Sequence, residues 1–121
     1  MVGKIGKLKN KMIIDEDLLK ADINISTSGD NTIINAPGLG QYLAIDFVSL
    51  LPTTAVTVQF KDGTTNYGGP LPLAAQQALT WENSSRQQKG IITCSDNSAF
   101  VINLGGAVQV GGMVRYRIVN R

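Results

Sequence analysis

Few side chains in this sequence could do chemistry, and their types limit what that chemistry could be. The 121 residues include no histidine, which excludes Ser-His-Asp and Cys-His nucleophile systems and imidazole metal ligands. Cys94 is the single cysteine, so no intrachain disulfide can form, and a buried thiol is expected. The composition therefore favours a protein that is not an enzyme and that carries no metal and no cofactor.

The carboxylates and glycines offer three partial motifs. Asp15-Glu16-Asp17 is the only acidic run, and adjacent carboxylates on an exposed segment are poorly held for acid–base work, so we interpret it as solvated charge. The segment 62–66 has some oxygen ligands of a calcium loop but lacks the other acidic residues, and Asp62-Gly63 is typical of a turn. Gly38-Leu39-Gly40 lacks the third glycine and the following helix of a phosphate-binding loop.

Basic residues are the remaining candidates for binding a partner. The net charge of +2 is too small for a general nucleic-acid surface, so no nucleic-acid partner is expected. Four lysines near the N-terminus and three arginines on the outward face of the last predicted strand are candidates for docking to another protein: Lys4, Lys7, Lys9, Lys11, Arg115, Arg117 and Arg121. Alternatively, the arginines form a solvated strand face that prevents edge-to-edge aggregation.

Aromatic residues give a further alternative. Trp81, Tyr42 and Tyr67 could form a stacking platform for a sugar, as in a carbohydrate-binding module. Packing in the core or at an interface is the favoured interpretation of these rings.

Apolar and polar residues alternate along most of the chain, which is the period of β-strands. Val56, Val58 and Phe60 are expected to face inward, and by the same pattern Leu43, Ile45 and Phe47 are expected to share a face. The runs expected to be strands are 21–27, 32–35, 41–51, 54–61, 90–94, 98–104 and 108–118. Seven to eight strands between regularly spaced turns predict an all-β fold, an antiparallel, jelly-roll-like β-sandwich.

The residues between the runs predict how the strands connect. Gly29-Asp30-Asn31 predicts a hairpin between the first two runs, and Gly105-Gly106 predicts a hairpin between the last two. The segment from Gly68 to Leu73 has two prolines that cannot donate to a ladder, so it is expected at a sheet edge or crossing.

The length fits one domain, predicted over residues 21–121, preceded by an N-terminal arm over residues 1–20. Two glycines weaken a helix in the arm, and we expect it to order on a partner. The sequence has no apolar run typical of a secretory signal or of a membrane span, so no membrane association is expected.

Four segments resemble a small β module that recurs in virion proteins of tailed bacteriophages. The resemblance covers about residues 28–118, and the chain departs from the pattern at Gln76-Gln77 and in its lysine-rich arm. The segments that carry it are Ser28 to Ala36 (SGDNTIINA), Ala55 to Gly63 (AVTVQFKDG), Gly69 to Ala75 (GPLPLAA), and Phe100 to Gly112 (FVINLGGAVQVGG) followed by Val114-Arg115-Tyr116.

The resemblance implies a structural role in the virion. The expected function is that of a decoration or cement protein on the capsid surface, which binds the major capsid protein and stabilises the shell. A homo-oligomer is expected, with a trimer favoured. A head-fibre or tail structural module is the alternative within virions, and a carbohydrate-binding module is the alternative from another class.

Overall fold

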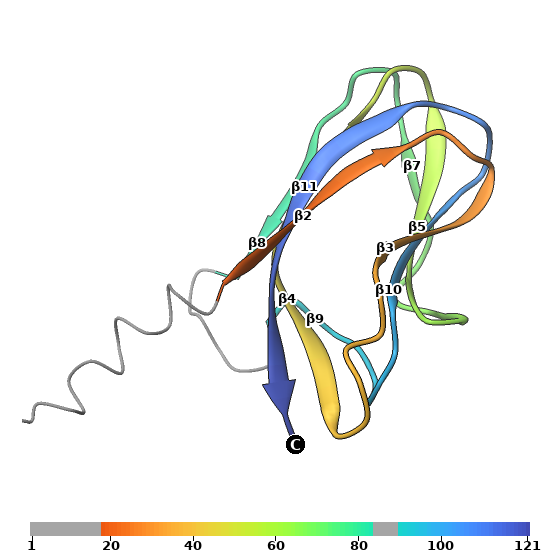
Figure 1. Cartoon of the computed structure of the whole chain (residues 1–121). Helices are drawn as coiled ribbons and strands as arrows, with labels where there is room; N and C mark the ends of the chain where they lie inside the picture. The colour runs from red at the N-terminus through yellow and green to blue at the C-terminus, as the bar shows by residue number, and fades with distance from the viewer. Residues whose placement is uncertain (1–17, 84–89) are drawn as a thin grey trace, which may run out of the picture.

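The computed structural model describes residues 18–83 and 90–121, which form ten strands in two antiparallel sheets that pack face to face (Figure 1). The strands are β2 (Leu19–Ile25), β3 (Gly29–Ile34), β4 (Gln41–Pro52), β5 (Val56–Asp62), β6 (Thr65–Asn66), β7 (Leu71–Leu73), β8 (Leu79–Glu82), β9 (Ile92–Thr93), β10 (Phe100–Leu104) and β11 (Val110–Asn120). These described ranges contain no helix, and so none that could cross a membrane.

One sheet has the strand order β3-β10-β5-β6, with β7 also paired to β5, and the other has the order β2-β11-β4-β8, with β9 also paired to β4. The predicted all-β antiparallel sandwich is confirmed. The strands outnumber the predicted runs because β6, β7 and β8 have only two to four residues, too few for alternation to be visible. β7, which contains Pro72, pairs only with β5, as expected for a proline segment at an edge.

The connections cross between sheets more often than the turn residues predicted. β2 and β3 lie in different sheets, and so do β10 and β11, so both predicted hairpins are wrong. Glycine turns fix where the chain reverses, but not the strand with which it pairs next. Here the strands before and after each turn, β2 and β3 or β10 and β11, lie in opposite sheets, and their apolar faces cover the same core from its two sides. The Asp62-Gly63 turn does form a hairpin, between β5 and β6.

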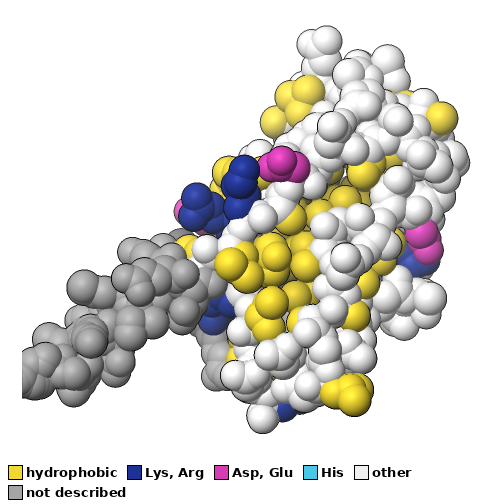
Figure 2. Space-filling model, viewed as in Figure 1, with side chains coloured by type: hydrophobic (Ala, Val, Ile, Leu, Met, Phe, Trp, Pro, Cys, Tyr) yellow, Lys and Arg dark blue, Asp and Glu magenta, His cyan; other side chains and the backbone are white. Residues whose placement is uncertain are grey.

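The core lies between the two sheets, where apolar side chains fill the space in the view of Figure 2. The predicted inward positions Val56, Val58 and Phe60 are all buried. The side chains that are at most 2% exposed and largest in volume are Phe60, Phe100, Ile23, Leu43, Ile45, Leu50, Ile92, Ile102, Leu104, Val48, Val58 and Val110. Removal of this apolar surface from water is the main term that stabilises the sandwich.

A β-bulge interrupts the alternation of β4. In the ladder with β11, Phe47 is the partner of Arg115 and Ile45 is the partner of Tyr116, so Asp46 is an extra residue. The bulge shifts the pattern by one, and Val48 is fully buried while Phe47 lies on the outer face. The prediction that Phe47 shares a face with Leu43 and Ile45 is therefore wrong.

Gly112 of β11 marks a place where two backbones approach closely. A Cβ at this position would overlap the carbonyl oxygen of Ser49 and lie 2.7 Å from the Cα of Leu50, both on β4. Only glycine fits without moving one of the two long central strands.

We expect Gly112→Ala to lower the free energy of unfolding by about 1–3 kcal/mol or more, because the added methyl group pushes β4 and β11 apart. Gly106→Ala is the control, since a Cβ at Gly106 meets no atom within 4 Å, and it should change stability by less than about 0.5 kcal/mol. Urea unfolding of both variants tests this, and equal stabilities would contradict the close approach.

Candidate docking face

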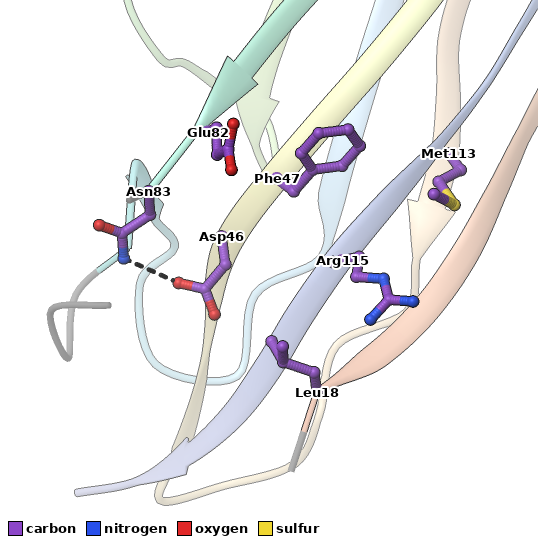
Figure 3. A pocket seen from close by; sticks show the side chains of 7 residues that line it. All are labelled: Leu18, Asp46, Phe47, Glu82, Asn83, Met113 and Arg115. Atoms are coloured by element: carbon purple, nitrogen blue, oxygen red, sulfur yellow. Dashed lines mark hydrogen bonds between the residues drawn. The ribbon is translucent and has the colours of Figure 1, made fainter. Parts of the chain in front are cut away.

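The outer face of the sheet β2-β11-β4-β8 contains an open hollow of about 210 Å³ beside the bulge (Figure 3). We call this outer face the docking face. Leu18 lies just before β2, and Asn83 lies just after β8. The residues that line the hollow are Leu18, Asp46, Phe47, Glu82, Asn83, Met113 and Arg115.

The bulge residue Asp46 is held by a network of hydrogen bonds. The Arg117 guanidinium donates from Nε to Asp46 Oδ2 at 2.6 Å and from Nη2 to Oδ1 at 2.9 Å, a two-point ion pair. Asn83 Nδ2 donates to Asp46 Oδ1 at 3.0 Å, and the Asn83 backbone N–H donates to the Asp46 carbonyl at 2.7 Å. Side chains from β11 and from the end of β8 therefore fix the bulge, and with it the position of Phe47.

The predicted arginines have three different environments. Arg115 is exposed and lines the hollow, as a docking residue would. The side chain of Arg117 is only 16% exposed because it pairs with Asp46, so its first role is structural. Arg121 is half exposed, lies 3.5 Å from Asp96, and stacks with its guanidinium carbon 4.3 Å from the centre of the Tyr42 ring. The four candidate lysines Lys4, Lys7, Lys9 and Lys11 lie outside the described residues.

Sequence reasoning missed the residues that shape the hollow. Alternation places Phe47 on the same face as Leu43 and Ile45, and Met113, Glu82 and Leu18 belong to no motif. One signal was present: Asp46 is a carboxylate within the apolar run from Leu43 to Leu50, and a charge in a buried strand requires a partner.

The other motifs of the sequence have structural roles. Asp62 Oδ2 accepts hydrogen bonds from the Ser95 backbone N–H at 2.9 Å and from Ser95 Oγ at 2.7 Å, which ties the end of β5 to the β9–β10 connection. In residues 18–83 and 90–121, no three His, Cys, Asp or Glu side chains gather as a metal site would require. Cys94 is buried, and burial, followed by the charge of Asp62, raises the pKa of its thiol to about 12.

Each of the three aromatic residues considered for sugar binding packs against, or is hydrogen-bonded to, another part of the sandwich. Trp81 is 37% exposed and packs edge-on against the core residue Phe60, with 5.3 Å between ring centres. Tyr42 is only 6% exposed, and the half-buried Tyr67 accepts a hydrogen bond from the Thr93 N–H at 3.4 Å. Their placement fits packing rather than a stacking platform.

We expect Arg117→Ala to cost about 3–5 kcal/mol of stability, because it leaves the buried Asp46 carboxylate without its charged partner. The double variant Asp46→Leu with Arg117→Met should recover most of that loss. Lys20→Ala is the control: its pair with Asp22 is exposed, and its loss should cost less than about 1 kcal/mol. Thermal unfolding measures all three, and a loss no larger for Arg117→Ala than for Lys20→Ala would contradict the role of the pair.

The Asp62 carboxyl gives a pH prediction. Burial is the largest influence on its pKa and raises it, but hydrogen bonds from Ser98 and Ser95 together outweigh burial and lower the pKa below its usual 3.8. A carboxyl with a lowered pKa in the folded state stabilises the fold above its unfolded pKa and loses that contribution as the pH falls. Asp62→Asn should therefore destabilise the protein near neutral pH, and the difference from wild type should shrink below about pH 4. Unfolding curves across this range check it, and a difference independent of pH would contradict it.

No protein-family model matches this chain, and no curated protein matches it. Function is therefore inferred from the fold, the docking face and the resemblance of the four segments.

Proposed function

We propose that this protein is a structural component of a tailed-bacteriophage particle, which binds the outside of the capsid as a decoration or cement protein and stabilises the shell. The observation that carries the proposal is the docking face, whose hollow is lined by the apolar Phe47 and Met113 and by the charged Arg115 and Glu82. The proposed location of the protein is the capsid surface, and its proposed partner is the major capsid protein.

The composition of the docking face supports a protein contact. Phe47 and Met113 supply an apolar floor, while Arg115 and Glu82 supply charges at the rim. An apolar centre with a polar rim, enriched in aromatic residues, Met and Arg, is typical of protein interfaces. Because strands and the Arg117–Asp46 pair hold the surface, little freedom has to be lost on binding.

The resemblance to phage virion modules is the reason for proposing a capsid as the binding partner. On a symmetric shell, many copies of a small sandwich gain avidity from modest individual contacts. The lysine-rich N-terminal segment is the proposed attachment to the shell. A head-fibre or tail module would use the same rigid body, and its copy number and place in the particle would differ.

Deletion of residues 1–12 should weaken attachment to shells while leaving the melting temperature nearly unchanged. All core residues of the described part lie at Ile23 or later, and the first described strand begins at Leu19, so the loss falls on the complex rather than on the fold. Attachment of the intact protein should weaken as salt rises, with a shallower dependence for the truncated form, because salt screens exposed lysine contacts.

Shell attachment is measured by co-sedimentation with purified particles stripped of this protein, at low and high salt. Mass spectrometry of intact virions should find the protein at a fixed, high copy number on heads. Equal attachment of both forms at both salt concentrations would mean that the shell contact lies on the sandwich and not on residues 1–12. Absence from heads would contradict the proposed function itself.

A further inference from the structure

Leu39 is an exposed apolar side chain on a fixed turn. It is 86% exposed, about twice the exposure of Leu51 and Ile118, which are 42% exposed. It lies between Gly38 (φ 125°) and Gly40 (φ 78°) in the β3–β4 connection, and these two backbone conformations favour glycine. Figure 2 shows apolar atoms that protrude at the lower end of the body, where Figure 1 places this connection.

Segments from distant parts of the chain hold this turn. The Gly38 N–H donates to Asn97 Oδ1 at 2.9 Å, and the Arg121 N–H donates to the Gly40 carbonyl at 2.8 Å. The Gln41 N–H closes the turn on the Gly38 carbonyl at 3.2 Å. The conformational entropy of the turn is lost on folding, so Leu39 is presented for binding at little further entropic cost.

Two charged residues lie beside this apolar knob. Asp96 Oδ2 accepts from the Gly40 N–H at 3.4 Å, the backbone N–H of Arg121 donates to the carbonyl of the same glycine, and Arg121 Nε lies 3.5 Å from Asp96 Oδ1. Both side chains are more than 40% exposed. The knob therefore has one acidic and one basic neighbour, and the hollow of the docking face has Arg115 and Glu82 at its rim.

We propose that the Leu39 knob of one copy inserts into the hollow of a second copy. Leu39 would contact Phe47 and Met113, while Asp96 and Arg121 would meet Arg115 and Glu82. Each of the two surfaces has an apolar side chain beside one acidic and one basic side chain, so opposite charges can face each other across the contact. The inference rests on the proposed function only in taking the docking face as a surface for protein contact.

The proposed contact joins two different surfaces of the same chain. Such a heterologous contact closes into a ring or continues as a filament, depending on the rotation between copies. A ring of three copies would be the trimer that the sequence favours. The contact would occupy only the hollow, so shell attachment would use the N-terminal segment and the rest of the docking face.

The experiment measures self-association of the full-length protein, without any shell, by sedimentation velocity and native mass spectrometry. Wild type should form a closed oligomer at micromolar concentration. Leu39→Ser and Met113→Glu should each weaken self-association by roughly thirtyfold or more, the loss typical of a central interface side chain. Leu51→Ser removes another exposed leucine, outside the hollow, and should leave association unchanged. Circular dichroism confirms that each variant is folded.

Mixing the two defective variants gives the sharpest test. Leu39→Ser keeps an intact hollow and Met113→Glu keeps an intact knob, so an equimolar mixture should form one-to-one heterodimers. A two-fold contact that pairs identical surfaces gives no such rescue.

Three results would overturn the inference: a wild type that stays monomeric, an oligomer that survives Leu39→Ser, and two variants that fail to form heterodimers. If the intact protein is monomeric and self-associates only after deletion of residues 1–17, the N-terminal segment, and not a second copy, occupies the hollow. Because no shell is present, failure here leaves the capsid proposal standing, and failure of shell attachment leaves self-association standing.

Discussion

The ion pair between Arg117 and Asp46 is the interaction on which the arrangement of this protein depends. It stabilises an extra residue in β4, the longest strand, and so sets which β4 side chains reach the core. With the bulge in place, Val48 and Leu50 are buried, and Phe47 lies on the outer face. A regular β4 would place Phe47 in the core and Val48 in water. The same local irregularity therefore completes the core and builds the floor of the docking face.

Crossing connections explain how distant segments come to support the Leu39 turn. Because β10 and β11 lie in different sheets, the Asp96-Asn97 turn that leads into β10 and the C-terminal Arg121 both arrive at the start of β4. Their polar groups satisfy the backbone of the connection between Gly38 and Gln41. An exposed leucine held in this way is unusual for a surface loop, which ordinarily is polar and mobile.

The sequence predicted those features that depend on neighbouring residues. Alternation placed Val56, Val58 and Phe60 inward, and Asp62-Gly63 marked a hairpin, because side-chain direction and turn geometry are local properties. Strand partners are not local. The turn at Gly105-Gly106 says nothing about whether β11 joins β10 or β4, since burial of two apolar faces in one core decides that choice.

The candidate site was harder to predict than the fold, because residues far apart in sequence, such as Leu18, Phe47 and Met113, line the hollow. Of the predicted arginines, Arg115 lies at the hollow, whereas Arg117 was predicted as exposed and is mostly buried against Asp46. A residue pattern that assumes regular strands cannot locate a bulge. An acidic residue within an apolar strand is the signal that would have indicated one.

Thiol accessibility at positions 47 and 48 shows whether Asp46 forms a bulge in β4. Phe47→Cys and Val48→Cys are compared for reaction with a maleimide under native conditions, where Cys94 is buried with its pKa raised to about 12 and contributes little. The bulge predicts rapid labelling at position 47 and labelling at position 48 only after unfolding. Protection at 47 with rapid labelling at 48 would mean that β4 is regular, and the account of both the core and the docking face would be wrong.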